Sequence, residues 1–177
     1  MDKNINFIKK HIKSIPDFPK PGVIFRDIST LLESPEALDK VINIFVTRYL
    51  ETAITHIGAI DARGFIFGSI VAYKLKVPIV LFRKPGKLPG AVIKSNYKTE
   101  YNENTLEIKD NSLNKSSKII IFDDLIATGG SLIAACNLAT QLNAKVIEVA
   151  SIIDLPKLKG STKIEQQGIS VFSIISY

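Results

Sequence analysis

The sequence has few of the residues that define metal-rich and disulfide-rich proteins. It holds one cysteine and two histidines in 177 residues. A single cysteine excludes an intramolecular disulfide and a cysteine-rich zinc cluster, and it is typical of a reducing compartment. His11 and His56 have no histidine, cysteine or acidic partner at metal-ligand spacing, so we interpret both as structural. Cys136 lies among alanine and leucine residues of a predicted helix and is expected to be a small buried side chain.

Long apolar runs are also missing. No stretch approaches the roughly 20 apolar residues of a membrane span. Residues 1–15 carry four lysines and lack the run of about 7–15 apolar residues that a signal peptide needs, so we expect a cytoplasmic protein. The hydrophobic fraction of 46% and the charged fraction of 23% exclude collagen-like, disordered and coiled-coil chains. The length favours one domain.

Acidic residues are fewer than basic ones. Lys and Arg number 23 against 17 Asp and Glu, which gives a net charge of +6. A positive field attracts anions, but it does not distinguish nucleic acid from a phosphorylated metabolite. Because the lysines are scattered and no basic run reaches five residues, we expect no nucleic-acid partner.

Segments rich in isoleucine and valine alternate with helical patterns along most of the chain. Strands are predicted over residues 56–60, 77–82, 118–122, 145–153 and 171–176, and helices over 2–13, from Pro35 to 49, 64–75 and 131–142. This alternation indicates an α/β fold with a mainly parallel sheet flanked by helices. The proline-rich segment 15–22 excludes a helix or a central strand. Residues 91–108 fit either a polar hairpin or a long mobile excursion.

The segment with the clearest chemistry starts at the end of a predicted strand. Asp123 and Asp124 are adjacent carboxylates, and Thr128–Ser131, with two glycines, then opens a helix. Exposed N–H groups and the positive end of a helix favour a phosphate, and ligands bind at this edge of an open α/β sheet. The carboxylates would repel a phosphate unless they bind ribose hydroxyls, with a divalent cation nearby. The segment therefore predicts a ribose-5-phosphate site, and it is not a Walker A loop because no lysine follows the glycines.

Two further segments favour anions. Asp61–Gly64 lies between a predicted strand and a predicted helix, and its Arg63 offers a fork of donors suited to phosphate oxygens. Arg83, Lys84 and Lys87 are three cations within five residues, in a loop stiffened by prolines and glycines. Both segments follow predicted strands of the sheet.

The run from Asp123 to Ser131 resembles the phosphoribosyl pyrophosphate motif of type I phosphoribosyltransferases, with Ser131 where threonine is more common. The resemblance covers nearly the whole chain and narrows to the adenine-specific members of the family. Residues 16–28, 61–68, 83–90 and 100–101 match their segments in order and spacing, although Pro85 replaces a basic residue found in some members.

The resemblance implies a glycosyltransferase that moves a pentosyl group. It would transfer the 5-phosphoribosyl group of 5-phospho-α-D-ribose 1-diphosphate (PRPP) to N9 of adenine, giving AMP and diphosphate. Mg²⁺ would be held mainly through the substrate, with no dedicated set of protein ligands. The resemblance further implies a homodimer of one domain, residues 1–177, with a base-binding hood over 1–33 and a flexible lid over 91–110.

The resemblance also implies a role for each matching residue. Ribose and 5-phosphate would be bound by Asp123, Asp124, Leu125, Ile126, Ala127, Thr128, Gly129, Gly130 and Ser131. Diphosphate would be bound by Asp61, Ala62, Arg63, Gly64, Arg83, Lys84 and Lys87, with a non-proline cis peptide in the first of these loops. Adenine would be bound by Ile24, Phe25, Arg26 and Leu155. Glu100, with Tyr101 beside it on the lid, would be the catalytic acid/base, and Glu103 and Glu107 are the alternatives.

Two alternatives to this function stay open. The same chemistry could act on another nucleobase, or the chain could be a non-catalytic regulator of the same fold that senses PRPP and binds nucleic acid. The regulator is disfavoured because no helix-turn-helix domain fits before Pro16.

Overall fold

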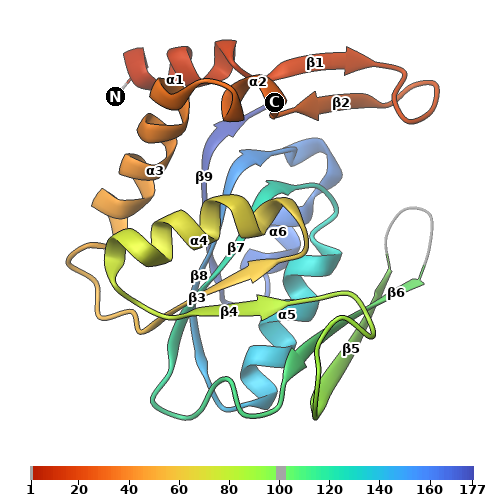
Figure 1. The fold of residues 1–177 in the computed structure, drawn as a ribbon. Coiled ribbons are helices and arrows are strands. Elements are labelled where there is room, and N and C mark those ends of the chain that lie inside the picture. Colours follow the sequence, from red (N-terminus) through yellow and green to blue (C-terminus); the bar gives the residue numbers. More distant parts are fainter. Residues whose placement is uncertain (1, 99–102) are drawn as a thin grey trace. The chain divides into compact units, whose positions relative to one another are not determined.

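The structure is a computed structural model that describes residues 2–98 and 103–177. The chain divides after Thr47 into two compact units. Figure 1 labels the helices and strands. Within the described residues, no helix is both long enough and apolar enough to cross a membrane.

The first unit contains a two-stranded ribbon and short helices. Its elements are α1 (Asp2–Lys10), β1 (Lys13–Pro16), β2 (Ile24–Asp27), α2 (Ser29–Leu32) and most of α3 (Pro35–Tyr49). The ribbon is antiparallel, with Lys13 opposite Asp27, and this pairing ends α1 three residues before its predicted end. The proline-rich segment forms the turn of the ribbon, where the Asp17 side chain accepts the Gly22 N–H at 2.7 Å. The prediction that this segment is neither a helix nor a central strand is confirmed.

The second unit is built on a five-stranded parallel sheet in the order β4-β3-β7-β8-β9. Its strands are β3 (His56–Ile60), β4 (Ile79–Phe82), β7 (Lys118–Ile126), β8 (Lys145–Asp154) and β9 (Ser170–Ser176). Figure 1 shows α4 (Arg63–Leu75) over one face and α5 (Gly130–Gln141) over the other, and η1 (Pro156–Leu158) and α6 (Gly160–Glu165) follow β8. The predicted α/β fold is confirmed.

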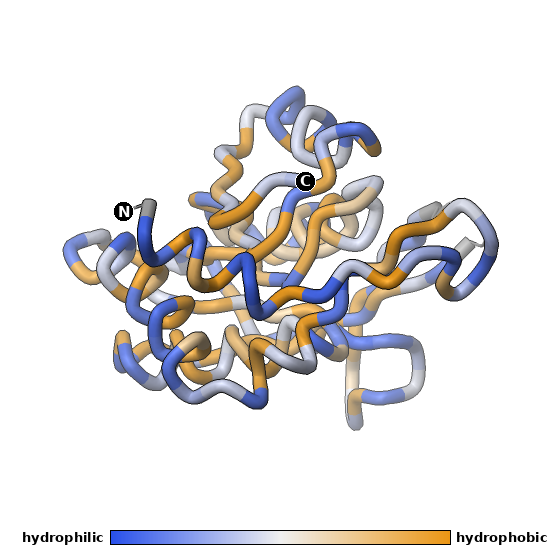
Figure 2. Tube along the Cα trace, turned by 90° about the horizontal axis from the view of Figure 1, so that it is seen from above, coloured by the Kyte–Doolittle hydropathy of each residue, from blue (hydrophilic) through white to orange (hydrophobic). Residues whose placement is uncertain are grey.

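The sheet is apolar on both faces, as a parallel sheet covered on both sides requires. Ile119 and Ile121 of β7 pack in one buried cluster with Leu132 of α5. Ile120 and Phe122 alternate with them along the strand and are also fully buried, so they cover the opposite face. In Figure 2, hydrophobic stretches alternate with hydrophilic turns along the chain, which is the pattern that the sequence analysis used.

The largest differences from the predicted strand bounds are in β7 and β4. β7 continues through the two carboxylates to Ile126 instead of ending at Phe122, because its pairing with β8 runs on past them. β4 begins at Ile79 rather than Val77, since Pro78 has no N–H to donate. The extension of β7 places the carboxylates on a rigid strand rather than in a loop.

The segment between β4 and β7 is a hairpin. β5 (Val92–Lys98) and β6 (Glu103–Lys109) are antiparallel, with Ile93 opposite Ile108. Ile93 and Tyr97 pack against the cluster that includes α5. The hairpin interpretation is therefore confirmed over the described part of this segment.

Candidate functional site

The carboxyl ends of three neighbouring strands carry the polar residues that the sequence analysis singled out. Asp61 follows β3, Arg83 follows β4, and Asp123 and Asp124 lie near the end of β7. These strands are parallel and adjacent, so their carboxyl ends share one edge of the sheet. The structure thus brings the predicted ribose and diphosphate segments to the same edge.

The loop after β7 is shaped by a contact between two glycines. Gly129 has a φ of +81°, a left-handed conformation that favours glycine, and a Cβ built on it would lie 2.9 Å from the Gly160 carbonyl oxygen. A Cβ on Gly160 would overlap the carbonyl of Ala127. α5 then begins at Gly130, one residue before its predicted start. The loop therefore needs Gly160, which the sequence analysis missed because a single glycine 30 residues downstream carries no distinguishing local signal.

The two carboxylates differ in their surroundings. Asp124 is 3% exposed, and its Oδ2 lies 2.9 Å from Nε of Arg63. Asp123 is half-buried, and its Oδ1 accepts the backbone N–H of Asp124 at 2.9 Å. Burial and the charge of Asp124 raise the pKa of Asp123 well above its ordinary value. Burial also raises the pKa of Asp124, and Arg63 opposes that shift. Deprotonated, this pair offers acceptors only, which suits a diol.

The loop between β3 and α4 holds the second anion segment. The peptide bond between Asp61 and Ala62 is cis, as the family resemblance implies. Arg63 is the first residue of α4. Gly64 packs so tightly on β7 that a Cβ there would lie 2.8 Å from the Phe122 carbonyl oxygen. A side chain at position 64 would push the loop away from the carboxylates.

The basic loop after β4 is tied to the hairpin by one buried acid. Glu107 of β6 is 2% exposed and exchanges backbone hydrogen bonds of 2.9 and 2.7 Å with Arg83. Its Oε2 accepts the Gly86 N–H at 3.0 Å, and its Oε1 lies 2.9 Å from Nζ of Lys94. The hydrogen bonds from Lys94 and Gly86 lower the pKa of Glu107. Glu107, an alternative for the acid/base, is thus engaged in holding this loop.

The cations of the basic loop differ in their contacts. The Arg83 guanidinium donates from Nε to Asp61 Oδ2 at 3.1 Å and from Nη1 to the Lys87 carbonyl at 3.3 Å. Lys84 and Lys87 are exposed. The loop therefore presents one oriented guanidinium and two solvated ammonium groups.

The residues predicted to bind adenine belong to both units. In the first unit, Ile24 is exposed, Phe25 is half-buried with an edge contact to Phe18, and Arg26 donates to the Ser14 hydroxyl. In the second unit, Leu155 follows β8 directly and donates its N–H to the Ile126 carbonyl at 3.0 Å. The predicted acid/base Glu100 and its neighbour Tyr101 lie outside the described residues.

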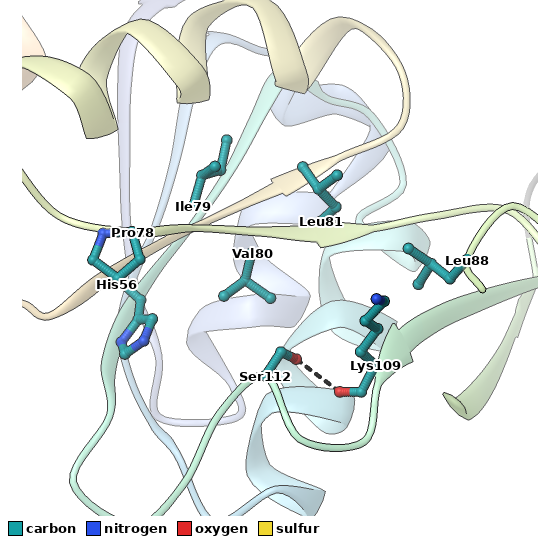
Figure 3. Close-up of a pocket in the computed structure, with 8 residues that line it drawn as sticks. All are labelled: His56, Pro78, Ile79, Val80, Leu81, Leu88, Lys109 and Ser112. Atoms are coloured by element: carbon teal, nitrogen blue, oxygen red, sulfur yellow. Dashed lines mark hydrogen bonds between the residues drawn. The ribbon is translucent and has the colours of Figure 1, made fainter. Parts of the chain in front are cut away.

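A separate apolar cleft of about 250 Å³ runs along β4. Figure 3 shows its lining, which is His56, Pro78, Ile79, Val80, Leu81, Leu88, Lys109 and Ser112. Among the described residues, this lining includes neither a carboxylate nor a glycine-rich loop. The Thr55 hydroxyl lies 2.7 Å from Nδ1 of His56, and burial lowers the pKa of His56. These contacts fit the structural role predicted for this histidine.

Comparison with known proteins gives a consistent set of relatives. The sequence matches the phosphoribosyl transferase domain family over residues 27–175. Adenine phosphoribosyltransferases from Pseudomonas aeruginosa (strain LESB58) and Pseudomonas fluorescens (strain SBW25) are each 54% identical over 170 residues, which is 96% of this chain and 93% of theirs.

Solved structures of adenine phosphoribosyltransferases share the fold of this chain. The enzyme from Thermoanaerobacter pseudethanolicus superposes with a TM-score of 0.92 at 36% identity, covering 98% of this chain and 99% of that one. The enzyme from Trypanosoma brucei, in complex with AMP, pyrophosphate and ribose-5-phosphate, gives a TM-score of 0.90 at 32% identity, covering 98% of this chain and 79% of that one.

Proposed function

This chain belongs to the phosphoribosyltransferase family, and we propose that it is an adenine phosphoribosyltransferase, an enzyme of purine salvage. It transfers the 5-phosphoribosyl group of PRPP to N9 of adenine and releases diphosphate. The observation that carries this conclusion is the pair Asp123 and Asp124 directly before a glycine loop that opens α5. That pair stands in a chain 54% identical to enzymes of this name over 96% of its length.

PRPP binds along the edge formed by β7 and the loop after it. Asp123 and Asp124 accept hydrogen bonds from the two ribose hydroxyls, because a carboxylate is an acceptor only. The N–H groups of Thr128–Ser131 and the positive end of α5 bind the 5-phosphate. The close contact between Gly129 and Gly160 supports this role, since it fixes the backbone on which the N–H groups lie.

Diphosphate binds between the loop after β3 and the loop after β4. Arg63, Arg83, Lys84 and Lys87 provide its positive charge, and a guanidinium matches two phosphate oxygens at once. Positive charge develops on the ribose as the diphosphate leaves, so these cations act on the departing anion. Arg63 and Arg83 each contact a carboxylate through Nε, so Asp124 and Asp61 offset part of their positive charge before diphosphate binds.

Mg²⁺ fits this site as a partner of PRPP. Among the described residues, no three histidine, cysteine, aspartate or glutamate side chains gather as a metal site. Asp123 and Asp124 supply hard oxygen donors, and Mg²⁺ commonly takes one or two carboxylates and completes its octahedron with substrate phosphates and water. When bound, the ion neutralises part of the diphosphate charge.

Adenine recognition rests on the family resemblance. In the first unit, Phe25 stacks on the ring and the backbone of Ile24 and Arg26 meets its Watson–Crick edge. N9 attacks C1 of the ribose opposite the leaving group, so the anomeric centre inverts. Glu100 accepts or shares the ring proton that must move as the bond forms.

We infer that two chains associate as a homodimer through α4. Ile66 and Tyr73 are 39% and 82% exposed and lie seven positions apart, so they share one face of the helix. Leu81 of β4 is 36% exposed. A second copy would cover these apolar side chains, and an isologous pair closes the assembly.

A comparison of bases tests the function. The protein is incubated with PRPP and Mg²⁺ and, separately, with adenine, hypoxanthine or guanine, while diphosphate release is followed. Adenine should give AMP and diphosphate in equal amounts, and the 6-oxopurines should give little of either. Equal rates with hypoxanthine would assign the enzyme to another base, and no release with any base would contradict the proposal.

A further inference from the structure

The segment assigned to the 5-phosphate has no positive side chain. From Asp123 to Ser131 the only charged side chains are two aspartates, which give a formal charge of −2. Arg63, beside this segment, lies within ion-pair distance of Asp124. A phosphate dianion bound to the loop would therefore face carboxylates and only the partial charges of N–H groups and a helix end. Its binding calls for a cation from elsewhere in the chain.

The fold brings α6 against this loop. The Gly160 carbonyl oxygen would lie 2.9 Å from a Cβ on Gly129, and Gly160 also packs on Ile126. Figure 1 shows α6 beside α5, whose first turn follows the loop. Side chains at these two glycines would separate α6 from the phosphate segment, so their absence sets the distance between the two.

One lysine of α6 reaches the loop. Lys163 is exposed, and its Nζ donates to the carbonyl oxygen of Thr128 at 3.5 Å. Its backbone N–H donates to the Lys159 carbonyl at 3.1 Å, which fixes its place in the helix. An ammonium group has three N–H donors, so a long bond to one carbonyl leaves donors for an anion at the same place.

We propose that Lys163 is a phosphate-binding residue of this enzyme, supplying the positive charge that the loop of Thr128–Ser131 lacks. The proposal rests on the proposed function, because it takes the 5-phosphate of PRPP and of AMP as the ligand. The 5-phosphate does not react, so Lys163 binds substrate and transition state alike. Its loss should raise KM for PRPP and leave kcat nearly unchanged.

The test compares two variants that each lose one lysine and therefore carry the same net charge. In Lys163→Met the cation next to the loop is removed, and in Lys145→Met an exposed lysine at the opposite end of β8 is removed. Affinities for AMP, adenosine and diphosphate are measured by calorimetry, and KM and kcat by diphosphate release.

We expect Lys163→Met to weaken AMP binding by roughly 5- to 20-fold, since the contact is charge-assisted but solvent-exposed. Adenosine and diphosphate should bind as in the wild type, and Lys163→Arg should recover part of the AMP affinity. Lys145→Met should bind all three ligands as the wild type does.

Wild-type AMP affinity in Lys163→Met, or an equal loss for AMP and adenosine, would overturn the assignment of Lys163. A failure of the proposed function would appear differently, in a wild-type protein that forms no AMP from adenine and PRPP. The two failures are therefore distinguishable in one set of measurements.

Discussion

Nε of Arg63 lies 2.9 Å from Oδ2 of Asp124, so a residue assigned to diphosphate is paired with a residue assigned to ribose. The same arrangement recurs one loop away, where Nε of Arg83 lies 3.1 Å from Oδ2 of Asp61. Without substrate, both arginines are neutralised by nearby acids, which limits the cost of gathering like charges at one edge of the sheet. Each guanidinium has further N–H donors besides Nε, so an arginine can contact its acid and a phosphate oxygen together.

Substitution of Asp124 should weaken catalysis through the ribose hydroxyls. Asp124→Asn replaces a charged acceptor by a neutral one, which costs roughly 1.5–3 kcal/mol for a charge-assisted hydrogen bond. We expect kcat/KM for PRPP to fall by about tenfold to a hundredfold. Asp110→Asn, at an exposed turn after the hairpin, is the matched control and should keep wild-type kinetics. Unchanged KM and kcat in Asp124→Asn would remove this residue from the site.

Glu107 should affect diphosphate binding without touching diphosphate. Glu107→Ala removes the acceptor for the Gly86 N–H and the partner of Lys94, so the basic loop loses its fixed position. We expect diphosphate affinity to fall by roughly tenfold or more, because small displacements of positioned groups weaken binding and catalysis strongly.

The control for Glu107 is a second buried acid. Glu148 accepts hydrogen bonds of 2.7 Å from Nε and Nη2 of Arg48 and one of 2.6 Å from the Tyr49 hydroxyl. Glu148→Ala should lower Tm and leave diphosphate affinity unchanged, because no residue of this cluster belongs to the proposed site. If Glu107→Ala lowers Tm but binds diphosphate normally, its role is structural only.

The raised pKa of Asp123 predicts a pH-dependent loss of stability. Below its ordinary pKa of 3.8 the carboxyl is protonated in both the folded and the unfolded chain and contributes nothing. As pH rises from there to the raised value of the folded state, the unfolded chain releases the proton first, so stability falls and then levels off. Asp123→Asn should remove this decrease in stability with rising pH, because an amide does not titrate in this range. The check is Tm against pH for both proteins, and a difference between them that does not vary with pH would contradict the shift.

The proposed dimer predicts the mass of the wild-type protein in solution and a substitution that should separate the two chains. Light scattering at micromolar concentration should give twice the chain mass of 19.5 kDa. The double variant Ile66→Lys with Tyr73→Lys places two charges on the exposed face of α4 and should give the monomer mass, because charges are excluded from the centre of such interfaces. A wild-type mass near 19.5 kDa would contradict the dimer.

Glu100 predicts a defect confined to the chemical step. In single-turnover kinetics with saturating substrates, Glu100→Gln and Glu100→Leu should both lose about 100-fold, which is within the range for general-base catalysis. PRPP affinity should stay within a few-fold, since PRPP is bound by other residues. Glu103→Gln, at one of the alternative positions, should keep a normal chemical step. A normal chemical step in Glu100→Leu would instead transfer the acid/base role to another glutamate.

The sheet was predictable because its strands are mostly rich in isoleucine and valine and alternate with helical patterns. The carboxylates and the glycine loop before α5 were recognisable because Asp123–Ser131 holds them within nine consecutive residues. The contacts between segments that are distant in the sequence were not predictable. Arg63 with Asp124 joins residues 61 positions apart, and nothing local in the sequence distinguishes a paired arginine from a solvated one.

Other features escaped sequence reasoning for the same physical reason. Glu107 looked like a mobile glutamate because its burial depends on a lysine across the hairpin and an N–H in another loop. The ribbon of β1 and β2 was missed because its two strands are only four residues each. β1 is exposed along its length and most of β2 is half-buried, so neither shows an alternating apolar pattern.

The most direct test of the site is a crystal structure with AMP and diphosphate bound. The AMP phosphate should lie within hydrogen-bond distance of the N–H groups of Thr128–Ser131, its ribose hydroxyls should contact Asp123 and Asp124, and diphosphate should contact Arg63. The Arg63 guanidinium would then lie between diphosphate and Asp124, which its Nε contacts at 2.9 Å without ligand. An AMP phosphate bound instead at Asp61–Gly64, or ribose hydroxyls away from both aspartates, would contradict the account.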